Sequence, residues 1–282
     1  MDVSTFISHR RTLARPDGEI AFTEWGTGPA AVFVHGVTAS GALWRHVIES
    51  LSGTTRCIAV DLPGHGATPP RKDPSVSAMA QMVTDLCQGL GLDQVDLVGI
   101  DTGGAVAQLV AARHPSLLRS LTLTNCDTEG NFPPAEIVPI VEAARQGAVV
   151  PILLPLAADP AAARASMLAG SYEHPELIPD DVWREYLVPV GGDCERARYF
   201  EQILAAMYPA ELEGVNDLLR GLEVPTLVVW SRGETAFGIE SGRRLSELIP
   251  GARGLTKVEG KLFYPEERPE ELVGALRRHW NR

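Results

Sequence analysis

An aspartate stands in the middle of the stretch VGIDTGGA (98–105), where its side chain could act on a bound molecule. The apolar run before Asp101 is typical of a strand and the run after it of a helix. Gly99 and Gly103 are small enough to let such a strand and helix approach closely, which would hold the carboxylate exposed at the apex of the turn. The Thr102 amide would then point into the same site from the helix N-terminus, where negative charge is favoured.

A helix cap is the plain alternative for Asp101, because aspartate is a preferred N-cap residue. A cap does not need small residues two positions away on both sides. The glycine pattern therefore favours a chemical role.

A second turn supplies a matching part. The segment VFVHGVTASGALWRHV (32–47) places His35 and Gly36 directly after an apolar run, so the Val37 amide could be a second donor to an oxyanion. We expect His35 to shape the backbone of this turn. His65, in the glycine-rich turn DLPGHGATPP, is expected to be structural as well.

Short apolar runs alternate with helical patterns around these turns, which predicts an α/β fold with a mostly parallel sheet covered by helices on both faces. We expect strands at 30–34, 57–60, 95–100, 121–125 and 225–230, and helices at 42–51, 76–91, 105–114, 242–249 and 269–280. From about Asp127 to Gly221 the pattern is helical without a clear strand. The predicted division is a core of residues 1–126 and 222–282, with residues 127–221 as a helical cap over the carboxyl ends of the strands.

The composition and net charge of the chain limit the kinds of molecule that it is expected to bind. The 282 residues include 45% hydrophobic and 22% charged residues, the mean hydropathy is +0.01, and the net charge is −11. This charge disfavours nucleic acid, whose phosphates need lysine and arginine, and favours a small hydrophobic molecule. No apolar run approaches the roughly 20 residues of a membrane span and no signal peptide is evident, so we expect no membrane partner and a cytoplasmic location. A homodimer stays open.

Neither a metal nor another cofactor is expected. The four cysteines lack CxxC spacing and are interpreted as buried, reduced thiols. The glycines after Asp101 lack the Lys-Ser/Thr of a phosphate-binding loop.

Together, the strand followed by His-Gly, the PGHG turn, the GxDxGG turn, the helical insertion and the PTLVVW strand resemble the α/β-hydrolase fold from about residue 18 onward. The aspartate at the turn is similar to the branch of haloalkane dehalogenases and epoxide hydrolases. In that branch the aspartate attacks carbon to form an ester, and a histidine oriented by a carboxylate activates the hydrolytic water. The resemblance implies Glu234, after PTLVVW, as that carboxylate, with Asp127 as the alternative.

The same resemblance places the histidine shortly before a Glu-Glu-Arg-Pro stretch, and Leu262 occupies that position in EGKLFYPEERP. The triad is therefore degenerate. Of the other histidines, His174 in the predicted cap is the candidate that could reach Asp101. Tyr172 and Tyr186 also lie in the predicted cap, where epoxide hydrolases place paired tyrosines, although such tyrosines commonly just pack.

Three hypotheses follow. The first is an enzyme that does not complete hydrolysis, with Asp101 as acid/base in proton transfer, elimination, rearrangement or cyclisation, and with the Val37 and Thr102 amides as the oxyanion site. The second is a hydrolase of an epoxide, haloalkane or ester with a relocated base such as His174. The third is a non-catalytic binding protein for a small molecule.

Overall fold

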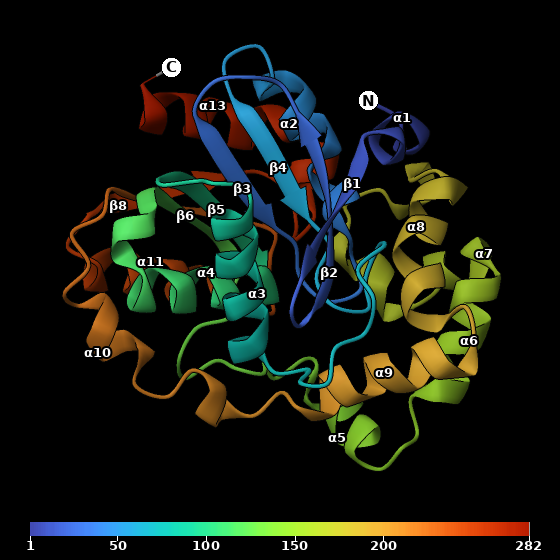
Figure 1. The fold of residues 1–282 in the computed structure, drawn as a ribbon. Coiled ribbons are helices and arrows are strands. Elements are labelled where there is room, and N and C mark those ends of the chain that lie inside the picture. The colour runs from blue at the N-terminus through green and yellow to red at the C-terminus, as the bar shows by residue number, and fades with distance from the viewer. Residues whose placement is uncertain (282) are drawn as a thin grey trace.

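The computed structural model describes residues 1–281. The strands are β1 (Arg10–Arg15), β2 (Gly18–Trp25), β3 (Ala30–Val34), β4 (Arg56–Val60), β5 (Val95–Asp101), β6 (Leu118–Cys126), β7 (Thr226–Ser231) and β8 (Ala252–Val258). Within the described residues they form one eight-stranded sheet in the order β1-β2-β4-β3-β5-β6-β7-β8 (Figure 1). The strands β3 to β8 run parallel, whereas β2 is antiparallel to both of its neighbours. All five predicted strands are present.

The sequence pattern missed β1, β2 and β8. The strands β1 and β8 lie at the two edges of the sheet and expose much of their length, so their residues are too polar to read as buried strands. By contrast, every residue of β5 is buried, as expected for a central parallel strand.

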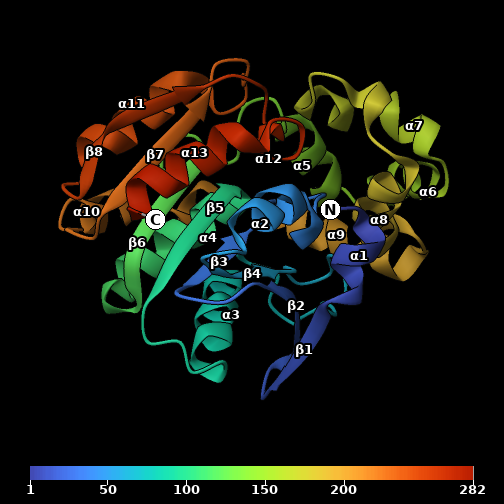
Figure 2. The same ribbon diagram turned by 90° about the horizontal axis from the view of Figure 1, so that it is seen from above.

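Helices cover both faces of the sheet. They are α1 (Val3–Ser8), α2 (Arg45–Leu51), α3 (Val76–Gly89), α4 (Thr102–Arg113), α10 (Val215–Leu219), α11 (Gly238–Leu248), α12 (Tyr264–Glu267) and α13 (Pro269–Trp280). The helices α2 and α13 pack together on one face, and α3, α4 and α11 lie on the other (Figure 2). Short 3-10 helices are η1 (Gly41–Trp44), η2 (Pro115–Leu117), η3 (Met167–Ser171), η4 (Pro175–Leu177) and η5 (Pro209–Glu211).

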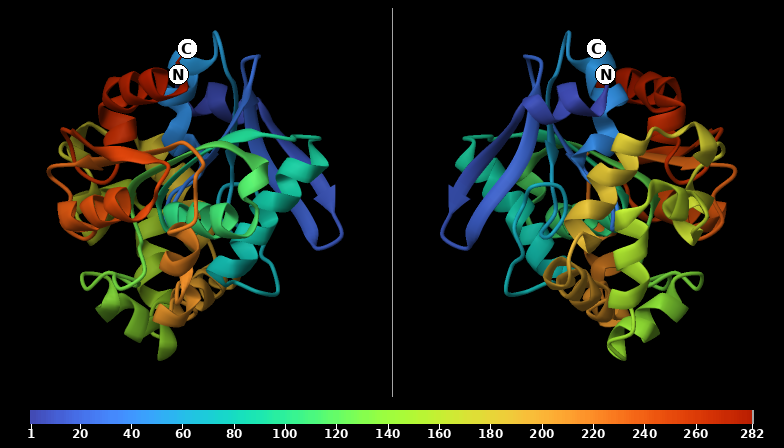
Figure 3. Two further views of the ribbon diagram at one scale, coloured as in Figure 1. Left: turned by 90° about the vertical axis from the view of Figure 1, so that its left-hand side faces the viewer. Right: turned by 90° about the vertical axis from the view of Figure 1, so that its right-hand side faces the viewer.

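The chain between β6 and β7 is helical, as the sequence predicts, and we call residues 127–221 the helical insertion. Its larger helices are α5 (Val138–Arg145), α6 (Val150–Ala158), α7 (Pro160–Arg164), α8 (Asp180–Gly191) and α9 (Cys194–Ala205). These five pack on one another beside the sheet, whereas α10, at the end of the insertion, packs on α4. Both termini lie on one side of the molecule and α5 and α9 reach toward the opposite side (Figures 1 and 3).

Local signals explain where these helices begin. Asp193 caps α9 by accepting hydrogen bonds from the amides of Glu195 and Arg196, both at 2.9 Å. Asp180 and Asp181 place negative charge in the first turn of α8.

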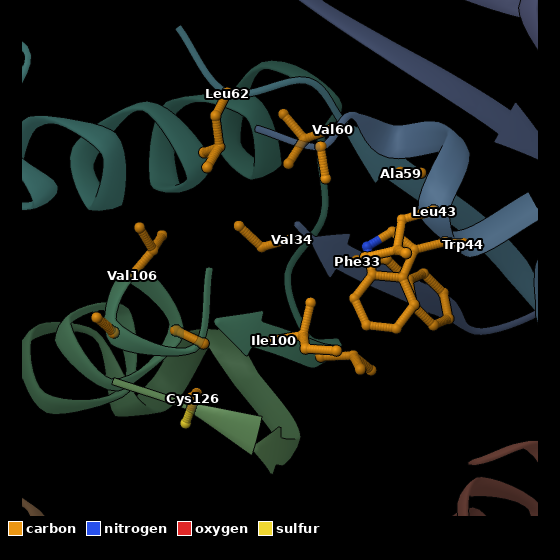
Figure 4. Packing of buried hydrophobic residues seen from close by; sticks show 14 of the residues in the cluster. Phe33, Val34, Leu43, Trp44, Ala59, Val60, Leu62, Ile100, Val106 and Cys126 are labelled. Atoms are coloured by element: carbon orange, nitrogen blue, oxygen red, sulfur yellow. The ribbon is translucent and has the colours of Figure 1, made fainter. Parts of the chain in front are cut away.

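The core lies directly behind the Asp101 turn. Phe33, Trp44 and Ile100 are fully buried together, with the Phe33 and Trp44 rings 5.4 Å apart (Figure 4). The close packing of the residue that precedes Asp101 fixes the end of β5 as a rigid support.

Candidate active site

Asp101 adopts the strained backbone of a sharp strand-to-helix turn. It ends β5 with φ 54° and ψ −134°, and α4 begins at the next residue. A positive φ costs free energy for a residue with a Cβ, so the surrounding structure must enforce it. The side chain makes no capping hydrogen bond to α4. The cap alternative is therefore wrong.

Three glycines make room for this turn. A Cβ on Gly99 would lie 2.4 Å from the Gly103 carbonyl oxygen, and one on Gly103 would lie 2.3 Å from the His35 carbonyl oxygen. A Cβ on Gly36 would lie 2.0 Å from Asp101 Oδ2. The His-Gly turn thus passes directly beside the carboxylate, a contact of Gly36 that could not be predicted from the local sequence.

A second carboxyl group is held next to Asp101. The Asp127 amide donates to the Asp101 carbonyl oxygen at 3.3 Å, and Thr102 Oγ1 donates to Asp127 Oδ2 at 3.1 Å. Asp127 Oδ1 is buried and has no hydrogen-bond partner within residues 1–281. Such an atom is costly to leave charged, so the group favours a proton or a ligand donor.

The electrostatics of the pair follow from this burial. Burial raises the pKa of Asp127 to about 7, against the lowering effect of the Thr102 hydroxyl. Burial first, and then the charges of Asp127 and Glu234, raise the pKa of Asp101 well above its usual value, while the Thr102 amide opposes this. Two carboxyl groups with raised pKa values retain a proton more readily near neutral pH than ordinary aspartates do.

Glu234 lies in the turn after β7, as the resemblance implies. Its Oε1 accepts a hydrogen bond from the Ala236 amide at 2.7 Å, and burial raises its pKa. The structure therefore brings both candidate acids, Glu234 and Asp127, into the electrostatic surroundings of Asp101.

Leu262 lies at the carboxyl ends of β6 and β7. Its neighbour Lys261 has a carbonyl oxygen that accepts hydrogen bonds from Asn125 Nδ2 at 3.4 Å and from Ser231 Oγ at 3.2 Å. The Gly233 amide, one residue before Glu234, donates to the Gly260 carbonyl oxygen at 2.9 Å. The resemblance implies a histidine at this position, whereas the Leu262 side chain is apolar and only 9% exposed.

The histidines near the His-Gly turn are fully engaged. His35 Nε2 accepts from the Leu62 amide at 3.0 Å and its Nδ1 lies 2.6 Å from the Gly36 carbonyl oxygen. His65 Nε2 accepts from the Thr38 amide at 3.3 Å. Burial lowers the pKa of His35 to about 4 and that of His65 to about 3, so both are neutral and support the backbone. Val37, in the same turn, has an amide without a partner among the described residues, and that amide is free to donate to a ligand.

His174 does not lie over Asp101. Its side chain is 60% exposed and its Nδ1 lies 3.3 Å from Glu176 Oε1. The expectation that this residue reaches into the site is wrong, because the backbone of residues 173 and 174 is tied to Glu267 and turns the imidazole to solvent.

Tyr172 and Tyr186 are fully buried, and both hydroxyls donate to Glu266 Oε2 at 2.8 Å. The other oxygen of Glu266 lies 2.6 Å from Arg45 Nη2. Burial, and then the charge of Glu266, raise the pKa of both phenols. These tyrosines are therefore bound to a carboxylate of the core. The sequence did not predict this cluster, because Tyr172, Tyr186 and Glu266 are far apart in the chain and no local motif links them.

The four cysteines differ in exposure. Cys57, Cys87 and Cys126 are buried thiols, but Cys194 is exposed, because it occupies the first turn of the surface helix α9. Within the described residues, no group of three histidine, cysteine or acidic side chains is arranged to hold a metal ion.

No single helix in residues 1–281 has both the length and the apolar composition to cross a membrane. The helices α5 and α6 meet those criteria only together, and they meet at an angle of 115°.

A family model described as alpha/beta hydrolase fold matches residues 29–261. The chain belongs to this family. It is 25% identical over 263 residues to haloalkane dehalogenase 2 of Mycobacterium tuberculosis, which covers 92% of this chain and 90% of that relative. It is 30% identical over 139 residues to bifunctional epoxide hydrolase 2 of Sus scrofa, covering 47% of this chain and 25% of the relative.

Other similarities are shorter in sequence or concern the fold alone. An uncharacterized Mycobacterium tuberculosis protein, Rv2715, is 38% identical over 106 residues, which span 37% of this chain and 31% of that protein. The chain thus spans a third or less of the length of these two partial relatives. The structure of a putative ancestral haloalkane dehalogenase, AncHLD2, matches with a TM-score of 0.80 at 20% identity, covering 96% of this chain and all of the other.

Proposed function

We propose that this α/β-hydrolase-fold protein is an enzyme that acts on a small hydrophobic molecule by proton transfer, without completing a hydrolytic cycle. The observation that supports the proposal is the burial of Asp101 and Asp127 next to each other, together with Leu262 at the position where the resemblance would place a histidine base. Asp101 is the acid/base, and the negative charges of Asp127 and Glu234 raise its pKa and so favour a proton on its carboxyl group.

The remaining parts suit a reaction that passes through an enolate or alkoxide. The Val37 and Thr102 amides would donate to the developing oxyanion beside Asp101. The helical insertion would act as a cap over the carboxyl ends of the strands and limit the access of water. Proton transfer next to a carbonyl group, elimination, rearrangement and cyclisation all fit these parts.

Hydrolysis is the second candidate, because haloalkane dehalogenase 2 resembles this chain over 92% of its length. In this version Asp101 attacks the carbon of an epoxide or haloalkane and forms an ester. Since Leu262 stands at the position expected for the histidine, and His35, His65 and His174 contact other groups, we expect that ester to hydrolyse slowly.

One experiment separates these candidates. The wild-type protein and the Asp101→Asn variant are incubated with hydrophobic epoxides and haloalkanes, and the mass of each intact protein is then measured by mass spectrometry. In parallel, a hydrophobic ketone is incubated with each protein in heavy water, and exchange of the protons next to its carbonyl group is followed. Asparagine keeps the size of the side chain but cannot act as an acid or base.

Exchange of ketone protons by the wild type alone, without an adduct, is the expected result. An adduct that accumulates only on the wild type makes Asp101 a nucleophile stranded at the ester and overturns the leading proposal. Ligand binding that survives Asp101→Asn without any reaction would instead indicate a binding protein.

A further inference from the structure

A cleft of about 300 Å³ lies between α10 and α11, and neither Asp101 nor Asp127 is among the residues that line it. Arg220, which directly follows α10, and Arg244 of α11 line it, and the apolar side chains of Leu245 and Leu248 form one wall. Because Ser241, Arg244, Leu245 and Leu248 recur at helical spacing, one side of α11 faces the cleft. This volume is at the lower end of the range typical of small-molecule sites.

The acidic residues of the cleft are occupied by other partners. Glu129 accepts hydrogen bonds from the Gly214 amide at 3.1 Å and from the Asn216 amide at 2.7 Å, so its two oxygens hold the start of α10. Glu247 Oε1 pairs with Arg243 Nη1 at 2.8 Å. Their charges are thus partly compensated without the two arginines of the cleft.

The two guanidinium groups are far less engaged. Within residues 1–281, Arg244 has no carboxylate within ion-pair distance and makes one long hydrogen bond, 3.4 Å, to Ser241 Oγ. Arg220 Nε lies 3.7 Å from Asp217 Oδ1, and both of these side chains are mostly exposed, so solvent weakens the pair. In a chain of net charge −11, the cleft thus holds two loosely held arginines beside two carboxylates that have other partners.

We propose that this cleft binds a small organic carboxylate. The guanidinium groups of Arg220 and Arg244 would hold the carboxylate through charge-assisted hydrogen bonds, and the hydroxyls of Thr128 and Ser241 line the same space. The wall of Leu245 and Leu248 would pack on an apolar body, which inorganic anions lack. The site does not depend on the reaction proposed for Asp101.

Calorimetric titration of the full chain tests this with benzoate, with benzamide as the neutral analogue of the same shape, and with inorganic phosphate. Arg244→Gln and Arg220→Gln remove one charge each at the cleft. Arg113→Gln is the matched control, since it removes the same charge from the exposed end of α4.

Benzoate is expected to bind with a dissociation constant of about 1 mM or tighter, and each cleft variant should weaken it about tenfold or more. Benzamide should bind much more weakly, and Arg113→Gln should bind benzoate as the wild type does. Equal binding of benzamide, equal weakening by Arg113→Gln, or no benzoate binding at about 10 mM overturns the proposal. Phosphate binding as tight as that of benzoate overturns the organic carboxylate and leaves a simple anion site.

Discussion

Thr102 donates its hydroxyl hydrogen bond to Asp127 at 3.1 Å, so the residue that follows Asp101 in the chain is tied to the second carboxyl group of the site. This bond joins the first residue of α4 to the loop after β6. It also makes the charge of Asp127 sensitive to small movements of the Asp101 turn, because the hydroxyl is the group that lowers the pKa of Asp127 against burial. The two carboxyl groups therefore act as one unit.

Asp127 should make the protein less stable as the pH rises. Folding raises its pKa from 3.8 to about 7, so the folded chain binds more protons than the unfolded chain between these values, and the free energy of unfolding falls with rising pH across that window. Asp127→Asn should reduce this fall. Urea unfolding at a series of pH values measures it.

The buried histidines act in the opposite direction, since their folded pKa values lie below 6.5 and their contribution to stability is lost as the pH falls. They are the same in both proteins, so the difference between wild type and variant reports Asp127 together with its effect on the pKa of Asp101. The exposed Asp217→Asn is the control. Identical pH profiles for wild type and Asp127→Asn would contradict the raised pKa.

Gly36→Ala should slow the reaction strongly. The new Cβ would lie 2.0 Å from Asp101 Oδ2 and push the carboxylate away from its position, and a displacement of that size costs about 100-fold in rate. Exchange of ketone protons in heavy water measures the loss. Gly170→Ala, which has open space around its Cβ, should behave as the wild type. Full activity of Gly36→Ala would mean that the carboxylate does not act from this position.

Leu262→His should restore the hydrolysis of any ester formed on Asp101. The loop at residue 262 is fixed to Asn125 and Ser231 at the carboxyl ends of the strands, and Gly233, the residue before Glu234, is hydrogen-bonded to Gly260 of the same loop. A positioned general base contributes roughly 10²–10⁴-fold, so an adduct should disappear faster by that factor. Its decay is followed by intact-protein mass spectrometry.

Leu262→Gln is the control for that gain, since it is polar but cannot act as a base near neutral pH. Equal decay in both variants would show that position 262 cannot reach the ester. The result bears on hydrolysis alone and leaves the acid/base role of Asp101 to the ketone assay.

The hydroxyls of Tyr172 and Tyr186 should each stabilise the fold. Each donates to buried Glu266, so Tyr172→Phe and Tyr186→Phe should each lower the free energy of unfolding by about 1–3 kcal/mol. Glu266→Gln should cost more, about 3–5 kcal/mol, because it leaves Arg45 buried without a carboxylate. Urea unfolding measures all three.

Tyr208→Phe serves as the matched change, since Tyr208 is 50% exposed and a phenylalanine keeps its ring against Arg145. Tyr172→Phe and Tyr186→Phe should both have a lower free energy of unfolding than Tyr208→Phe. If Tyr172→Phe and Tyr186→Phe were no less stable than Tyr208→Phe, the cluster at Glu266 would not fasten the helical insertion to the core.

The strands and the turn at Asp101 could be predicted from the sequence because their causes are local. Buried parallel strands show as continuous apolar runs, and glycines at 99 and 103 report a close approach of strand and helix. The edge strands β1 and β8 were not predicted, because half-exposed strands carry polar residues and lack a continuous apolar run. The leucine at position 262 could also be identified from the sequence, because the resemblance places the histidine at a fixed distance before the Glu-Glu-Arg-Pro stretch.

Contacts between distant segments had no such local signal. From the sequence alone, the sharp turn at Asp101 could be predicted and the leucine at position 262 could be identified. Only the tertiary structure decided that Asp127 and Glu234 both act on its charge, that His174 faces solvent, and that Glu266 binds the two tyrosines. The physical reason is that pKa values and hydrogen-bond partners depend on burial and on groups far apart in the chain, which meet only when the chain has folded.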